Sequence, residues 1–178
     1  FPLGFLLFGV PFGEFMVQIG WVDGQAWRRR NDHFYAQYKD GTLDEHAYVE
    51  FATSAWRDRP LDDVLAVRER FMQQVMRPAL KPSALELVRE HQTAGDLTAI
   101  VTATNEFVTA PLAAAFGVEH LIALQLQRDA RGRVTGAIRG VPSFREGKIR
   151  RVDDWLAALG HRRADFARIT FYSDSTND

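Results

Sequence analysis

Polar side chains at three places in this 178-residue chain are of types that suit a phosphate ester. Thr102 lies in the run AIVTATN, and Asp174, Asn177 and Asp178 follow the apolar run at the end of the chain, in FYSDSTND. Lys148 lies between these two runs, in FREGKIRRV. A hydroxyl and an ammonium can hold phosphate oxygens, and a carboxylate can hold Mg²⁺, which prefers oxygen ligands. Together the three segments predict a site for a phosphate and a hard cation.

The elements that must position these residues are predicted from the apolar pattern. Short buried strands are expected at 97–101 and 169–172, with a pair of strands around a turn within 120–138. Helices are expected at 82–95 and 144–160. Strands that alternate with helices predict a parallel α/β sheet, and ligands of such sheets bind beyond the carboxyl ends of the strands. Both polar clusters are therefore expected at the same edge of the sheet.

Residues 12–80 have a different pattern, which predicts a bundle of about four helices joined by short polar connectors. Asp23 is a candidate N-cap of one helix, and Gly41 is a candidate stop for it. A stripe of apolar residues with a spacing of four follows Gly41 and predicts the next helix.

Composition limits the possible partners and compartments. With 22 basic and 23 acidic residues, the chain has no sequence-wide charge bias towards nucleic acid or an anionic membrane. It has no cysteine, which excludes disulfides and thiolate catalysis and is compatible with a cytoplasmic, reducing location. The apolar first 20 residues are broken by glycine, proline and Glu14, so no membrane helix is expected there. We interpret them as a strand or core segment, with a cleaved signal region as the alternative, of a chain whose natural N-terminus is missing or altered.

In these segments the chain resembles the haloacid dehalogenase superfamily, in its phosphoserine-phosphatase-like branch, subfamily IB. The resemblance covers about residues 20–178. Thr102 matches the second family motif, Lys148 the third, and Asp174 with Asp178 the fourth. The resemblance implies a Rossmann-like parallel sheet flanked by helices, with an inserted helical-bundle cap. On this pattern residues 12–80 form the cap, and residues 1–11 and 81–178 form a core that is incomplete at both ends.

The resemblance also implies a function, a Mg²⁺-dependent phosphatase that acts on a small phosphorylated metabolite through an aspartyl-phosphate intermediate. Thr102, Lys148 and Asp178 would be catalytic, and Asp174 would bind the metal. The substrate phosphate would be bound by Thr102, Lys148, Asn177 and the backbone N–H of Ala103. Asp178 would orient Lys148 or a metal-bound water. Nucleic acid and membranes are not expected as partners, and the sequence leaves the alcohol and the oligomeric state open.

The first family motif departs from the pattern, which requires a strand followed by two aspartates in DxDxT. The nearest segment is FLLFGVPF, where Gly9 and Pro11 occupy the two aspartate positions. Glu14 is out of register and inside a predicted helix. Three interpretations follow: a different natural N-terminus, a truncated or degraded gene product, or a non-catalytic relative that binds a ligand or partner. The end of the chain at Asp178, where the family continues, favours the first two.

Overall fold

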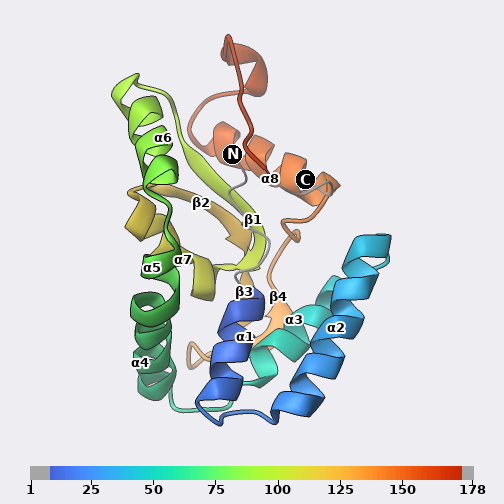
Figure 1. Ribbon diagram of the computed structural model, residues 1–178. Coiled ribbons are helices and arrows are strands. Elements are labelled where there is room, and N and C mark those ends of the chain that lie inside the picture. Colours follow the sequence, from blue (N-terminus) through green and yellow to red (C-terminus); the bar gives the residue numbers. More distant parts are fainter. Residues whose placement is uncertain (1–8, 174–178) are drawn as a thin grey trace. The chain divides into compact units, whose positions relative to one another are not determined.

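The computed structural model describes residues 9–173, which divide into two compact units (Figure 1). The α/β unit comprises residues 80–124 and 141–173 of this described part. The helical unit comprises residues 9–79 and 125–140. Each unit is described by itself below.

A parallel pair of strands forms the centre of the α/β unit, as the sequence predicts. Strand β1 (Ala99–Asn105) pairs with β2 (His120–Leu124), and helix α7 (Glu106–Phe116) connects them. The pairing is regular up to Thr102, which lies opposite Ala123, and the register then shifts before Asn105. Such an irregularity redirects the backbone at the end of a strand, a common feature beside functional sites.

Two longer helices complete the α/β unit. Helix α6 (Pro82–Thr93) begins with proline at its first position, and Gly95 follows the helix with a φ of 80°. Both end signals agree with the sequence prediction, because proline needs no amide partner there and glycine accepts the left-handed conformation. Helix α8 (Glu146–Ala158) contacts both β1 and β2. A short 3-10 helix, η3 (Arg163–Asp165), follows α8.

The predicted strand at 169–172 is wrong. Residues 166–173 have no regular secondary structure, and the side chains of Ile169, Phe171 and Tyr172 are exposed. β-propensity describes how a side chain fits a pleated surface, and a strand forms only where a partner strand accepts its backbone hydrogen bonds. Within the described residues β1 pairs only with β2, so 169–172 has no partner strand there.

The helical unit contains the helices predicted for residues 12–80. They are α1 (Gly9–Gln18), α2 (Gly24–Asp40), α3 (Glu45–Ser54), α4 (Leu61–Phe71), the π-helix η2 (Met72–Met76) and α5 (Arg77–Ala79). The Asp23 carboxylate accepts a hydrogen bond from the amide of Ala26 at 2.7 Å and caps α2. Gly41 ends that helix with a φ of 71°. No helix in residues 9–173 is long and apolar enough to cross a membrane.

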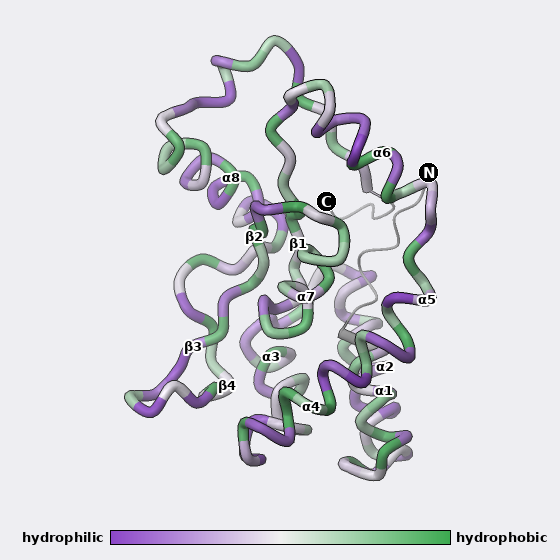
Figure 2. Tube along the Cα trace, turned by 90° about the vertical axis from the view of Figure 1, so that its left-hand side faces the viewer, coloured by the Kyte–Doolittle hydropathy of each residue, from purple (hydrophilic) through white to green (hydrophobic). Residues whose placement is uncertain are grey.

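Aromatic rings and a β-hairpin complete the helical unit. Phe51 stacks on Trp27, with ring centroids 4.2 Å apart, and on Phe34 at 5.3 Å. Strands β3 (Leu126–Arg128) and β4 (Val134–Ile138) pair antiparallel, and β4 contacts α3. The turn between them is largely hydrophilic (Figure 2). The sequence predicts two strands within 120–138, whereas the structure divides the first of them into β2 and β3, which belong to different units.

Candidate functional site

Thr102 is the last residue of regular pairing on β1, and its side chain is buried, with 4% of the residue exposed. Its Oγ1 accepts a hydrogen bond from the backbone amide of Thr104 at 3.1 Å. Among the described residues, the Thr102 hydroxyl donates to no acceptor. This hydroxyl therefore keeps a hydrogen that can be donated to a bound anion.

The turn from β1 into α7 places the N-terminus of that helix shortly after Thr102 in the chain. The side chain of Asn105 accepts from the amide of Val108 at 3.3 Å, so Asn105 is the N-cap of α7. The first amides of a helix carry partial positive charge and are suited to anions. Ala103 lies in the last part of β1, before this turn, and is half-buried. The sequence analysis missed Asn105, although an Asn directly before a helical pattern is a recognised capping signal.

Lys148 lies in the first turn of α8 and is buried, with 7% of the residue exposed. Burial lowers the pKa of its ammonium from 10.5 to about 8, because removal from water penalises the charged form. A lysine on a helix surface ordinarily extends its charge into solvent. The structure therefore excludes a solvated surface role for Lys148.

The loop before α8 holds the start of that helix tightly. A Cβ atom added at Gly147 would lie 2.1 Å from the backbone oxygen of Pro142, so only glycine fits there. The buried hydroxyl of Ser143 donates to the carbonyl of Ile122 on β2 at 3.1 Å. The amide of Lys148 donates to the carbonyl of Arg145 at 2.9 Å. The loop thus fixes the position from which the Lys148 side chain starts.

Arg151 orients the same helix towards the strands. Its guanidinium donates to the carbonyl of Ala123, the residue opposite Thr102 in the sheet. Arg151 follows Lys148 by three residues, so both lie on one side of α8. The structure therefore brings the helix side that carries Lys148 to the strand pair that carries Thr102. The sequence analysis missed Arg151, although a second basic residue at this helical spacing was visible.

The remaining predicted residues, Asp174, Asn177 and Asp178, lie outside the described residues. Within residues 9–173, no group of three or more His, Cys, Asp or Glu side chains could hold a metal ion. The predicted metal site depends on Asp174.

Residues 9–12, the described part of the segment matched to the first family motif, are helical. Gly9 and Pro11 both lie in α1, and neither side chain supplies a carboxylate. Glu14 lies further along α1 and pairs with Arg28 of α2, which lowers the pKa of the Glu14 carboxyl. Glu14 is thus engaged within the helical unit, in agreement with its predicted place inside a helix.

Comparison with known proteins identifies the family. The sequence pattern of the haloacid dehalogenase-like hydrolases matches residues 10–178. A histidinol-phosphatase from Neisseria meningitidis serogroup C (strain 8013) is 34% identical over 165 residues, which are 93% of this chain and 74% of the relative.

Solved structures agree with this match. A crystal structure of a protein of unknown function from Bordetella pertussis Tohama I has a TM-score of 0.87 and 45% identity, covering 96% of this chain and 77% of that one. A substrate-bound phosphoserine phosphatase has a TM-score of 0.56 and 17% identity, covering 85% of this chain and 66% of that one, and shows the shared fold. The family pattern over residues 10–178 and the relative with 34% identity show that this chain belongs to the haloacid dehalogenase-like hydrolase family.

Proposed function

We propose that this chain is a phosphatase-type protein whose α/β unit binds the phosphate of a small phosphorylated metabolite through Thr102 and Lys148. The burial of Lys148 carries this proposal. A buried ammonium costs free energy, and perturbed groups of this kind concentrate at functional sites. Its helix is bonded through Arg151 to the residue opposite Thr102, so the two candidate phosphate ligands belong to one packed assembly.

The relatives support the chemical class of the substrate. A histidinol-phosphatase with 34% identity favours a phosphate monoester of a small alcohol. Phosphoserine and histidinol phosphate both belong to this class. Two further predictions belong to this proposal. Residues 12–80 form the cap that selects the alcohol, and residues 1–11 and 81–178 form the core. The location is cytoplasmic, and the absence of cysteine from the sequence is compatible with that location.

The described residues do three things in this proposal. The Thr102 hydroxyl donates a hydrogen bond to a phosphoryl oxygen, and the Lys148 ammonium neutralises its negative charge. The N-terminus of α7 adds its positive end to the same place. Groups held rigidly in this way stabilise the charge that develops during phosphoryl transfer.

Residues outside the described part complete the proposed site. Asp174 would hold Mg²⁺, which when bound neutralises phosphate charge, while Asn177 would contact the phosphate and Asp178 would orient Lys148. The aspartyl-phosphate pathway of the family needs a carboxylate nucleophile. Because Gly9 and Pro11 occupy the matched positions, we expect this chain to turn over substrate very slowly.

A second function is favoured by the helical conformation of Gly9 and Pro11. On this reading the chain keeps the family fold without catalysis and binds a phosphorylated ligand or a partner. The buried Thr102 and Lys148 serve binding alone in that case. Both functions include anion binding, but only the first includes turnover of a substrate.

The experiment compares turnover of p-nitrophenyl phosphate with Mg²⁺ and calorimetric phosphate binding in the purified chain. The variants are Lys148→Ala, Thr102→Val and Asp174→Asn, with Thr104→Val as the control, since its backbone amide still bonds Thr102. Turnover that falls about 10²–10³-fold in the first three variants and not in the control supports the enzyme. Phosphate binding without turnover, lost in Lys148→Ala, supports the non-catalytic function. Phosphate binding that is unchanged in both Lys148→Ala and Thr102→Val rejects both functions.

A further inference from the structure

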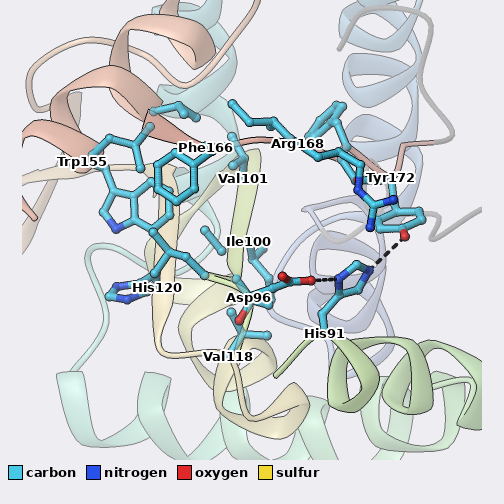
Figure 3. Close-up of a pocket in the computed structure, with 18 of the residues that line it drawn as sticks. His91, Asp96, Ile100, Val101, Val118, His120, Trp155, Phe166, Arg168 and Tyr172 are labelled. Carbon is cyan, nitrogen blue, oxygen red and sulfur yellow. Dashed lines mark hydrogen bonds and ion pairs between the residues drawn. The ribbon is translucent and has the colours of Figure 1, made fainter. Parts of the chain in front are cut away.

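The polar side chains of β1 are confined to its carboxyl end. Earlier in the strand, Ile100 and Val101 line a hollow together with Phe166 (Figure 3). From Thr102 onward the strand reads TATN and ends at Asn105. The change from apolar to polar side chains therefore begins at the residue that the proposed phosphate site uses.

An irregularity in the pairing of β1 brings Asn105 close to Thr102. Thr102 lies opposite Ala123 of β2, and Asn105 lies opposite Leu124, the next residue of that strand. Residues 103–104 have no register partner on β2, as in a β-bulge. The stretch from Thr102 to Asn105 is thus matched to one residue step of β2, which is about 3.3 Å in a parallel strand. The two residues occupy neighbouring register positions at the strand end.

Two hydrogen bonds fix the position of Asn105. Its backbone carbonyl accepts from the hydroxyl of Thr109 at 2.9 Å, and Thr109 is itself buried. Its side-chain Oδ1 accepts from the amide of Val108 at 3.3 Å. A carboxamide is planar, so a bond to Oδ1 also restricts the direction of the two N–H groups on Nδ2. The side chain is therefore held in place before a ligand binds.

The Nδ2 group of Asn105 donates to no acceptor within the described residues, although Asn105 is half-buried. An amide group that is withdrawn from water without a partner costs free energy. The buried hydroxyl of Thr102 is in the same condition, since it also donates to no acceptor there. Unused donors at neighbouring register positions are suited to one ligand that accepts several hydrogen bonds.

Asparagine differs from the other good capping residues in what it can donate. Asn, Asp and Ser all cap helices well through a side-chain oxygen, and Asp23 and Asp44 cap α2 and α3 in this chain. A carboxylate at the end of β1 would repel a phosphate. The carboxamide of Asn105 keeps the capping oxygen and adds two donors without negative charge.

We propose that Asn105 is a further phosphate-binding residue, which caps α7 through Oδ1 and donates to a phosphoryl oxygen through Nδ2. The inference rests on the proposed function, because the anion is the phosphate that Thr102 and Lys148 bind there. The amide donor is uncharged, so its contribution is independent of pH, whereas that of the Lys148 ammonium is not. Asn105 thus supplies a fixed neutral donor beside a titratable cation.

The test compares calorimetric phosphate binding and urea unfolding of the full chain with those of two variants. Asn105→Gly removes the donors, and glycine is an acceptable cap that costs little stability, so phosphate affinity should fall about tenfold. Asn105→Asp keeps the cap and the shape but replaces the donors with negative charge. Its affinity should fall further, with stability unchanged or higher, because an acidic residue is favourable at a helix N-terminus.

The control is Asp44→Gly, which makes the matched exchange at the cap of α3 in the helical unit. The carboxylate of Asp44 accepts from the amide of Ala47 at 3.0 Å, as Asn105 does from Val108. Phosphate affinity should stay at the parental value in this variant. Equal loss of affinity in Asp44→Gly and Asn105→Gly would show a general effect of losing a cap and would overturn the inference.

Two further readouts distinguish a ligand contact from a purely structural cap. In ¹⁵N-labelled protein, the side-chain amide resonances of Asn105, assigned by their absence from Asn105→Asp, should shift as phosphate saturates the site. Those of Asn31, which lies in α2, should not. The ratio of sulfate affinities between the parent chain and Asn105→Gly should be equal at pH 7 and pH 9. Unshifted Asn105 resonances at saturating phosphate would overturn the inference.

The outcomes separate this inference from the proposed function. Phosphate binding that is lost in Lys148→Ala but retained at parental affinity in both Asn105 variants overturns the role of Asn105 alone. Binding that is unchanged in Lys148→Ala and Thr102→Val, or absent from the parent chain, overturns the proposed function and this inference together.

Discussion

Arg151 on α8 donates a hydrogen bond to the backbone carbonyl of Ala123, which lies opposite Thr102 in the paired strands. This contact joins the helix that carries Lys148 to the strand pair that carries Thr102. It explains how two residues 46 positions apart in the sequence come to belong to one packed assembly.

Replacing Arg151 should weaken the attachment of α8 to β2. We expect Arg151→Ala to lower the free energy of unfolding by about 1–3 kcal/mol, because a charge-assisted hydrogen bond is lost and the Ala123 carbonyl loses a donor. Phosphate affinity should fall as well, since Lys148 is no longer held in place. Urea unfolding and calorimetry measure the two effects. Arg150→Ala, an exposed change on the same helix, should alter neither.

The buried ammonium of Lys148 should make stability depend on pH. Its pKa is about 8 in the folded protein, whereas the unfolded chain has the ordinary value of 10.5. Between these two pH values the lysine is therefore protonated in the unfolded chain and largely deprotonated in the folded protein. Stability from this group therefore rises as pH increases from about 8 to 10.5, by up to about 3 kcal/mol. The difference between unfolding curves of the parent chain and Lys148→Met isolates this contribution. Tyr48, whose pKa burial raises, is common to both proteins and cancels.

Anion binding should show the opposite pH trend, because it requires the charged form of Lys148. We expect sulfate, whose charge is constant in this range, to bind more weakly as pH rises through about 8. In Lys148→Arg the guanidinium stays protonated, so any remaining sulfate binding should lose this pH dependence. Calorimetric titrations at pH 7 and pH 9 measure both. The same pH dependence in both proteins would show that another group controls anion binding.

Gly147 should not tolerate a methyl group, although alanine is favoured in helices. The new Cβ would lie 2.1 Å from the carbonyl oxygen of Pro142, a backbone atom that cannot rotate away. We expect Gly147→Ala to cost about 1–3 kcal/mol of stability by overpacking. It should also weaken phosphate binding by shifting the start of α8. A gain of stability would show that the loop before α8 adjusts freely.

Phe51 should be the most sensitive ring in the helical unit, because it stacks on both Trp27 and Phe34. Phe51→Ala should lower the free energy of unfolding by about 3–5 kcal/mol through the cavity that it leaves. Phe51→Leu retains most of the volume and should cost less. Tyr35→Ala is the control, since Tyr35 is largely exposed and should change stability by about 0.5 kcal/mol or less. Urea unfolding followed by tryptophan fluorescence measures all three.

The sequence by itself determined the local elements with clear chemical end signals. Asp23 caps α2, Gly41 ends it, and Pro82 begins α6, because capping depends on side-chain chemistry within a few residues. The alternation of strands and helices was likewise enough to predict the parallel pair of β1 and β2. Thr102 and Lys148 were predicted as phosphate ligands from their order and context, and both side chains are buried in the structure.

Only the tertiary structure decided which segments find partners. The apolar run at 169–172 has strand-like residues, yet it is not a strand, since no strand in the described residues accepts its backbone hydrogen bonds. The predicted strand beginning at His120 is divided between two units, because its first half, β2, pairs with β1 across α7 and its second half, β3, pairs with β4 in a local hairpin. The roles of Arg151 and Gly147 also depend on the tertiary structure. Folding brings Arg151 to the carbonyl of Ala123 and Gly147 against the carbonyl of Pro142. Local pattern determines what a segment can become, and burial and pairing with distant segments decide what it is.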